Sequence, residues 1–239
     1  MRALHEVVDR ALADRSAITV LDAGCGAATH LSFRQPTRLV GIDMSSRQLD
    51  RHSALDEKVL GDVQTHRFAP GTFDVVIAWQ VLEHLPKPEQ ALERFRDAIK
   101  DGGLLILSLP NVLSVKGLVT KFTPHAFHVW AYRTLFGMKE AGADDKAPFP
   151  TFLRFSIRPA RIIRFARENG FAVEYFHSFE WHVQSELRKR VHLVGAAWWL
   201  VRSLVRVLTA GQVDAERTDF IVVLRKGGSR EHVFATERR

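Results

Sequence analysis

The sequence predicts an α/β fold in which a mostly parallel sheet is flanked by helices. Short apolar runs alternate with helical patterns along the first half of the chain. A turn rich in glycine follows the first of these runs directly. The run at residues 104–109 is apolar apart from Ser108, as expected for a central strand that is buried on both faces. A length of 239 residues suits one large domain of this class, so we treat residues 1–239 as a single domain.

Composition narrows the class of protein. With 46% hydrophobic and 26% charged residues, the chain has the composition of a folded globular protein. Cys25 is the single cysteine, which excludes an intrachain disulfide and a zinc site built from several cysteines, and we assign no metal ligand. Residues 1–16 carry acidic residues within an apolar pattern and predict a short amphipathic helix rather than a signal peptide. We therefore expect a cytoplasmic protein.

The predicted elements follow in chain order. We expect strands at residues 18–21, 39–42, 58–60, 73–78, 104–109, 171–176 and 220–224. A helix at residues 88–100 has Pro88 at its start and a stop at residues 101–103. A second helix at residues 158–169 ends before Gly170.

Chemistry-bearing residues follow the ends of the first four strands. In an open α/β sheet, ligands bind at the carboxyl ends of the strands, near the point where strand order reverses. Glycine there lets a ligand approach the backbone, and a carboxylate can accept hydrogen bonds from ribose hydroxyls. The residues at these ends are Asp22, Gly24 and Gly26, then Asp43, then Asp62 and Val63, and finally Trp79 and Gln80.

Several of these segments together resemble the class I S-adenosylmethionine-dependent methyltransferases. The segments are LDAGCG at 21–26, GID at 41–43, GDV at 61–63, FDVVIAWQVLEHL at 73–85 and IKDGGLLILSLPN at 99–111. They are similar in order and spacing to the small-molecule branch, which includes the ubiquinone-biosynthesis O-methyltransferases. The resemblance covers residues 18–111 and implies a Rossmann-like, seven-stranded, mostly parallel sheet whose cofactor is S-adenosyl-L-methionine.

The resemblance also implies a role for each matching residue. Asp22, Gly24 and Gly26 would hold the methionine end of the cofactor, and Asp43 would hold the ribose, with Met44 beside it. Asp62 and Val63 would face the adenine. Trp79 and Gln80 would line the sulfonium region, and His84 follows them.

Two departures from the family pattern concern the first turn. Ala28 stands where a third glycine is common, and fourteen residues separate Gly26 from Gly41. The first helix, around residues 27–33, must therefore be short. A nicotinamide dehydrogenase is the alternative, but its fingerprint has a third glycine where this chain has Thr29.

The segment at residues 112–157 is expected to form the acceptor pocket or lid. His125 and His128 are candidate general bases for a hydroxyl acceptor, and an ordinary surface or packed histidine is the alternative for each. An apolar pocket is expected because the segment is unusually aromatic. Its aromatic residues include Phe122, Phe127, Trp130, Tyr132, Phe136, Phe149, Phe152 and Phe155.

A helical insertion is expected at residues 183–210. Where family members have a hairpin, about forty residues stand between Phe176 and Phe220. Apolar residues recur every three or four positions over 187–208, with arginines on another face, which predicts one amphipathic helix. This helix could contact a membrane in its plane, pack as a lid, or join a second subunit.

The sequence thus predicts methyl transfer to a small, largely apolar or lipid-like acceptor, most plausibly at a hydroxyl. Net charge of +7 admits nucleic acid or anionic membranes, so an RNA methyltransferase is one alternative. We consider nucleic acid unfavoured because no paired catalytic cysteines or appended RNA-binding module is found. A catalytically silent partner protein is the other alternative. Location at the inner face of the membrane would accompany a peripheral contact.

Overall fold

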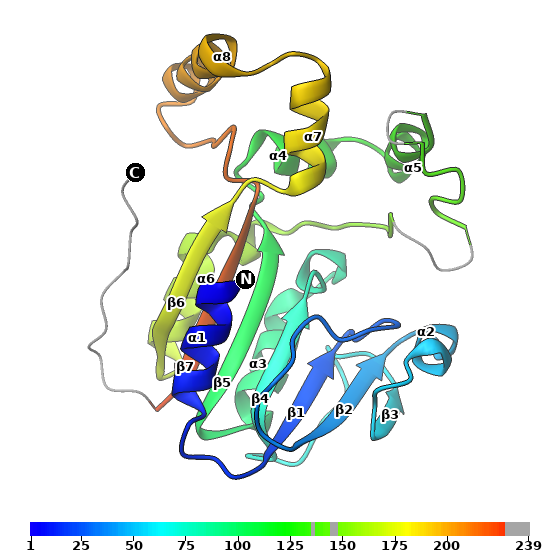
Figure 1. Ribbon diagram of the computed structural model, residues 1–239, viewed down its shortest axis with the longest axis vertical. Coiled ribbons are helices and arrows are strands. Elements are labelled where there is room, and N and C mark those ends of the chain that lie inside the picture. The colour runs from blue at the N-terminus through cyan, green and yellow to red at the C-terminus, as the bar shows by residue number, and fades with distance from the viewer. Residues whose placement is uncertain (135–136, 144–147, 228–239) are drawn as a thin grey trace.

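The computed structural model describes residues 1–134, 137–143 and 148–227. Within them, seven strands form one sheet in the order β3-β2-β1-β4-β5-β7-β6 (Figure 1). β7 runs antiparallel to both neighbours, and the other pairs are parallel. The strands are β1 (Ile18–Ala23), β2 (Thr37–Asp43), β3 (Glu57–Leu60), β4 (Phe73–Trp79), β5 (Ile99–Pro110), β6 (Phe171–Phe179) and β7 (Asp219–Lys226). The predicted fold class is confirmed.

The register brings the carboxyl ends of the parallel strands to one edge. β1 lies between β2 and β4, with Asp22 opposite Gly41 on one side and Ile77 on the other. Strand order reverses at β1 and β4, which is the place where ligands bind in sheets of this kind. Every residue of β4 before Trp79 is buried, which explains why this strand is apolar apart from Asp74.

Helices cover both faces of the sheet. α1 (Arg2–Ala11), the predicted N-terminal amphipathic helix, buries Leu4 and Val8 against one face. α3 (Pro88–Ala98) and α6 (Pro159–Glu168) cover the other face and bury Phe95 and Ile162 (Figure 1). α2 (Ser46–Arg51) packs beside β2 and β3. Because apolar side chains leave water on both faces, the sheet is enclosed between two cores.

The predicted helix at residues 27–33 is wrong. This segment is a chain of turns and bends that runs from Gly24 to β2. Leu31 is buried and Phe33 packs against the same core as α1, so the loop covers the sheet face without a helix. Thr29 hydrogen-bonds Asp22 through its side chain, and Pro36 disfavours helical backbone just before β2.

The helix predicted at 88–100 ends at Ala98, and β5 begins at once at Ile99. Residues 101–103 were expected to be a turn, but they lie within the strand, where the pairing with β4 shifts register between Phe73 and Val75. Gly103 permits this irregularity, because a Cβ there would lie 2.9 Å from the carbonyl oxygen of Asp74.

The segment after β5 contains α4 (Val115–Phe122), α5 (His125–Thr134) and the short helix η2 (Phe155–Ile157). All three precede α6, which matches the helix predicted at 158–169. Phe136 lies outside the described residues, as does the end of the predicted domain at 228–239. The division into a cofactor-binding half at 18–111, an acceptor segment at 112–157 and an insertion at 183–210 stays a prediction.

The single helix predicted at 187–208 is also wrong, because the chain forms α7 (His182–Arg190) and α8 (Gly195–Leu208). The two helices are bent by 120° relative to each other. His192 adopts a positive φ of 56°, with hydrogen bonds from the amide of Leu193 to the carbonyl of Arg188 and from its own amide to that of Lys189. This Schellman arrangement ends α7. No single described helix is long and apolar enough to cross a bilayer; the bent pair passes that test by length and composition only.

Candidate functional site

The glycine turn is fixed to the end of β2 by backbone hydrogen bonds. The amides of Gly24 and Cys25 both donate to the carbonyl oxygen of Ile42, at 2.7 and 3.2 Å. Gly24 has a φ of +69°, and a Cβ there would lie 2.6 Å from the Val81 side chain. Gly26 has a φ of +56°, but a Cβ there would meet nothing within 4 Å. The backbone at Gly26 is therefore open to an approaching ligand.

Asp43 joins the turn to the residues that follow β2. Its Oδ2 accepts a hydrogen bond from the Gly26 amide at 3.0 Å, and its Oδ1 accepts one from the Ser45 amide at 2.8 Å. Ser45 caps α2 by accepting from the amide of Gln48. Asp43 thus lies at the turn, where a ribose could bind its carboxylate, while the neighbouring Met44 side chain is exposed.

Asp22 is a buried carboxylate at the carboxyl end of β1. Burial raises its pKa to about 6; the hydrogen bond from Thr29 opposes this rise and the Asp43 charge adds to it. Thr29 donates its hydroxyl proton to Asp22 Oδ2 at 2.6 Å, and its oxygen lies 3.1 Å from His52 Nε2. His52 Nδ1 accepts from the Ala54 amide, so the proton of neutral His52 sits on Nε2. A positively charged ligand group near Asp22 would be favoured, because it would stabilise the ionised carboxylate.

Asp62 lies at the end of β3, and its carboxylate accepts hydrogen bonds from the backbone and side chain of Gln64 at 2.8 to 3.1 Å. Gln64 in turn accepts from the amide of Lys87 at 2.9 Å. The Val63 side chain is buried in the core. Asp62 therefore fixes the loop that follows β3. An adenine amino group bound there would have to share the Asp62 carboxylate oxygens with Gln64.

Trp79 and Gln80 end β4 beside the glycine turn. The Trp79 ring stacks on His30, with centroids 5.4 Å apart. Gln80 has a positive φ of 55°, and it donates to Ser108 of β5 from its backbone amide at 2.9 Å and from Nε2 at 3.1 Å. A non-glycine residue in this conformation is strained, and such strain is common at ligand sites. The sequence analysis assigned no role to His30. The loop that follows the glycine turn places its ring against Trp79 at the site.

His84 lies in the short helix η1 (Leu82–His84) after β4 and contacts the segment that follows β5. Its Nδ1 donates to the carbonyl oxygen of Pro150 at 2.7 Å, and its ring lies edge-on to Phe149. Burial lowers the pKa of His84; the Pro150 hydrogen bond opposes this and the nearby His125 reinforces it. Because Nδ1 carries the proton, Nε2 of the neutral ring is free to accept.

Glu83 precedes His84 and is a buried carboxyl group that the sequence prediction left without a role. Its Oε1 lies 4.0 Å from His84 Nε2, and its Oε2 is buried with no hydrogen-bond partner among the described residues. Burial raises the pKa of Glu83 to about 8; Asp219 adds to this rise and Lys116 opposes it. The sequence signal was a glutamate four residues after a buried strand, within a segment that also contains Val81, Leu82 and Leu85.

His125 and His128 lie on α5, with ring centroids 6.5 Å apart. His128 Nε2 lies 2.7 Å from the hydroxyl of Thr123, which itself donates to the carbonyl oxygen of Val119. Nε2 must then carry the proton, which leaves Nδ1 as the basic atom of neutral His128. Burial lowers the pKa of His128, and the neighbouring His125 lowers it further. His125 Nδ1 is buried and has no hydrogen-bond partner within the described chain.

The segment after β5 is fastened to this group of residues. The amides of Phe152 and Leu153 both donate to the carbonyl oxygen of Glu83 at 2.9 Å. Lys116 of α4 forms an ion pair with Asp219 at 2.8 Å. Aromatic side chains of the segment remain exposed, including those of Phe122, Phe127, Trp130, Phe149, Phe152 and Phe155.

The described residues fit S-adenosylmethionine at the glycine turn. The backbone at Gly26 is open, and the carboxylates of Asp22 and Asp43 are close enough for each to raise the pKa of groups beside them. Two such carboxylates suit a ligand with an ammonium group and ribose hydroxyls. Within the described ranges, no group of three or more His, Cys, Asp or Glu residues could hold a metal ion.

Comparisons with known proteins agree with this geometry. The chain is 32% identical over 160 residues to a ubiquinone biosynthesis O-methyltransferase of Paraburkholderia xenovorans, and the match covers 62% of each protein. A matching enzyme of the same name from Colwellia psychrerythraea is 28% identical over 161 residues, 63% of this chain and 59% of the enzyme. The chain thus matches about three fifths of the length of these relatives.

Solved structures share the fold at low sequence identity. Phosphoethanolamine N-methyltransferase 2 of Haemonchus contortus, in complex with S-adenosyl-L-methionine, superposes with a TM-score of 0.58 at 15% identity, over 95% of this chain and 53% of that one. A SAM-dependent methyltransferase of Archaeoglobus fulgidus superposes with a TM-score of 0.53 at 14% identity, over 93% and 94%. The family model of the methyltransferase domain matches residues 1–175, so this chain belongs to the methyltransferase domain family.

Proposed function

We propose that the chain transfers a methyl group from S-adenosylmethionine to a hydroxyl group of a small, largely apolar acceptor. Family membership and the fit of the glycine turn support the donor. The cofactor supplies a methyl group that its sulfonium already makes electrophilic. Distant similarity to ubiquinone biosynthesis O-methyltransferases supports oxygen as the accepting atom and an apolar acceptor.

The cofactor would be held by residues from four strand ends. Asp43 would accept hydrogen bonds from the ribose, and Asp22 would face the methionine ammonium. Asp62 and the backbone of Val63 would face the adenine, and Trp79 and Gln80 would line the sulfonium. Their task is alignment, because transfer needs the accepting oxygen, the methyl carbon and the sulfur in line.

The observation that carries the acceptor proposal is the row Glu83, His84, His125 and His128. These four side chains come from η1 and α5: Glu83 Oε1 lies 4.0 Å from His84 Nε2, His125 is close enough to lower the pKa of His84, and the ring centroids of His125 and His128 are 6.5 Å apart. Burial keeps the imidazoles of His84 and His128 neutral near pH 7, as a general base must be. His128 Nδ1 is our candidate for the atom that takes the proton from the acceptor hydroxyl, and His125 Nδ1 is the second candidate.

Apolar surroundings support an acceptor with little charge. Phe149 contacts His84, and Phe152 and Leu153 are bound to the backbone of Glu83. Aromatic side chains would shield the reaction from water and favour an apolar ring or chain. We keep the cytoplasm as the predicted location of the reaction.

The first experiment asks which molecules gain the methyl group. The full chain is incubated with S-adenosylmethionine labelled in its methyl group and with an extract of the cells that encode it. We expect label in the fraction soluble in organic solvent. Label found only in RNA would contradict the proposal in favour of the RNA methyltransferase alternative, and no label in any fraction would support a catalytically silent partner.

A second experiment tests the base with His128→Gln and His125→Gln. Loss of a general base lowers turnover by about a hundredfold or more, while cofactor affinity stays unchanged because neither residue lies at the glycine turn. His5→Gln on α1 is the matched control, and it should retain full turnover. Full turnover in both α5 variants would remove the histidine base from the proposal.

A further inference from the structure

α8 presents a broad apolar face to solvent. α7 and α8 are described throughout and contain no buried residue. Five large apolar side chains of α8 are between 58% and 77% exposed. They are Trp199, Leu200, Leu204, Val207 and Leu208. A cluster of this size on one helix is unusual for surface that faces only water.

These side chains share one side of the helix, and the other side faces the rest of the protein. At 3.6 residues per turn, residues 200, 204, 207 and 208 lie on one stripe, and Trp199 lies at its edge. Trp198, Val201 and Val205 are half-buried on the opposite side. The side of α8 that carries Trp198, Val201 and Val205 therefore packs toward the domain in part, and a more exposed apolar stripe points away from it.

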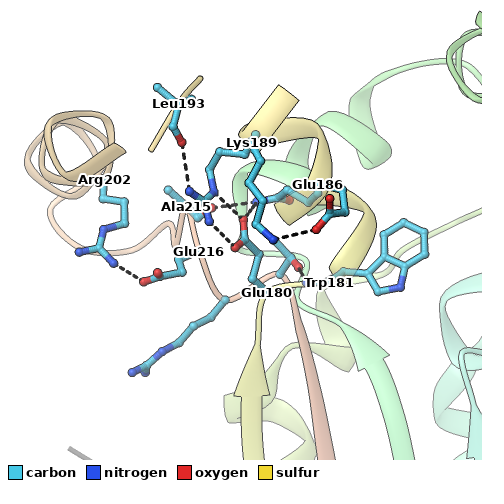
Figure 2. Close-up of polar contacts among 12 residues, drawn as sticks. Glu180, Trp181, Glu186, Lys189, Leu193, Arg202, Ala215 and Glu216 are labelled. Carbon is cyan, nitrogen blue, oxygen red and sulfur yellow. Dashed lines mark hydrogen bonds and ion pairs between the residues drawn. The ribbon is translucent and has the colours of Figure 1, made fainter. Parts of the chain in front are cut away.

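Polar contacts hold the two helices in place, as Figure 2 shows. Arg188 of α7 donates to both carboxylate oxygens of Glu180, at 3.1 and 3.0 Å, and to the carbonyl oxygen of Leu193 at 3.0 Å. Its guanidinium also lies 4.8 Å from the centre of the Trp198 ring. Arg202 of α8 forms an ion pair with Glu216. The apolar stripe is therefore displayed by a fixed element, because these contacts set the orientation of α8.

Positive charge borders this stripe. Residues 182–213 include five Lys or Arg residues; Arg188, Lys189 and Arg202 pair with Glu180, Glu186 and Glu216, while Arg190 and Arg206 have no ion-pair partner among the described residues. Arg206 follows Trp199 by seven positions and lies with it at one edge of the stripe, whereas Arg202 is turned toward Glu216, with which it forms an ion pair. Arg206 is exposed and has no ion-pair partner in the part of the chain that the structure describes. An apolar face with tryptophan and arginine at its edge is typical of helices that lie at a membrane surface.

We propose that α8 docks in the plane of an anionic lipid surface, with Leu200, Leu204, Val207 and Leu208 inserted among the acyl chains. A membrane-spanning pose does not fit, since α8 has 14 residues and a length of roughly 21 Å, and α7 turns away by 120°. A symmetric dimer through the same face would bring the arginine edges of two copies together, and these like charges would repel. Anionic lipid complements both the apolar stripe and its basic edge.

Docking would turn a defined end of the molecule toward the lipid. Figure 1 places α7 and α8 beyond the carboxyl ends of the parallel strands, on the same end as α4 and α5. That end carries the glycine turn and the histidines of α5. Lipid binding itself needs no methyl transfer, so the proposal stands independently of the reaction.

The test is co-sedimentation of the full chain with phosphatidylcholine vesicles that do or do not contain phosphatidylglycerol. We expect the wild-type chain to bind the anionic vesicles and to be released by salt. The double variant Leu200→Glu/Leu204→Glu should bind about tenfold more weakly, because it places charge on the inserted stripe. Arg206→Glu should weaken binding to anionic vesicles alone.

Leu60→Glu is the matched control, because Leu60 is 63% exposed on β3, which lies at the other end of the molecule from α8 (Figure 1). It should bind as the wild type does, and both variants should unfold at the wild-type temperature, since all three leucines are exposed. The proposal is overturned if the wild type does not bind anionic vesicles, or if the double variant binds as tightly as the control. It is also overturned if the free wild type is a dimer that the double variant converts to a monomer.

Discussion

At the carboxyl edge of the sheet, some residues stabilise the fold and others leave space for a ligand. Gly24 belongs to the first kind, because its positive φ and the nearby Val81 side chain leave no place for a Cβ. Gly26 belongs to the second, since open space lies beside it. Asp43 does both, because it fixes the turn through the Gly26 amide and presents its carboxylate at the proposed ribose position.

Glu83 makes the stability of the protein depend on pH. Burial raises its pKa from 4.5 to about 8, so the folded state binds more protons than the unfolded state between these values. The free energy of unfolding should therefore fall as the pH rises through this window, by up to about 1.4 kcal/mol per pH unit. Between about pH 7 and 8, above the range where Asp22 and the histidines with a lowered pKa titrate, Glu83 dominates this slope.

Urea unfolding of Glu83→Gln measures this effect. The amide keeps the shape of the carboxyl group and cannot ionise, so the fall in stability between about pH 7 and 8 should largely vanish. Glu89→Gln, an exposed position on α3, serves as the control and should keep the wild-type slope. A wild-type slope in Glu83→Gln would show that Glu83 is ionised in the folded protein at neutral pH.

The positions of the glycines and carboxylates could be predicted from the sequence, because parallel strands place their carboxyl ends at one edge of the sheet irrespective of the conformation of the loops. The sequence could not assign Glu83 a role, since burial of its carboxyl group depends on packing by residues more than sixty positions later. Phe152 and Leu153 bind its backbone, and Asp219 lies close enough to raise its pKa. The tautomers of His84 and His128 depend likewise on Pro150 and Thr123. The individual roles given to the site residues remain predictions.

Secondary-structure elements differ in how strongly local sequence determines them. The strands of the first half and α3 lie close to their predicted ranges because their apolar period and end signals agree. The segment at 27–33 was predicted as a helix from its place in the family pattern, but Thr29 and Leu31 bind and pack within a loop. The 187–208 pattern continues through the break at His192, because apolar spacing alone does not encode a left-handed residue.

Arg188 should decide whether α7 and α8 stay in place. Its guanidinium binds Glu180 twice and Leu193 once, and the Arg188 and Glu180 side chains are 16% and 13% exposed. Arg188→Ala leaves Glu180 without its partner, which costs about 1–3 kcal/mol locally. Hydrogen exchange of the amides at 182–208 should then accelerate about tenfold or more.

Lys189→Ala is the matched control for this variant. Lys189 pairs with Glu186 three positions away, and both side chains are more than half exposed, so the pair contributes little. Exchange in this control should match the wild type. Equal exchange in Arg188→Ala and Lys189→Ala would mean that the orientation of α8 does not depend on the Arg188 contacts.

At the scale of the whole molecule, the proposed cofactor site and the proposed acceptor site are built by different parts of the chain. β1, β2, β3 and β4 place the proposed cofactor residues at one edge, and the segments after β5 and β6 build the rest of the same end (Figure 1). The first site uses residues within one continuous stretch, which explains why sequence patterns revealed it. The second uses contacts between distant segments, such as the ion pair of Lys116 with Asp219.

Cofactor binding should therefore stabilise the whole fold, because the glycine turn lies between central strands. At a concentration about one hundred times its Kd, S-adenosylmethionine raises the free energy of unfolding by about 2.7 kcal/mol. Thermal unfolding with and without the cofactor measures this shift, and NAD should cause none. Asp43→Ala should lose most of the shift, while Asp50→Ala, an exposed acid on the adjacent α2, should keep it. A full shift in Asp43→Ala would place the ribose elsewhere, and a shift with NAD instead of S-adenosylmethionine would favour the dehydrogenase alternative.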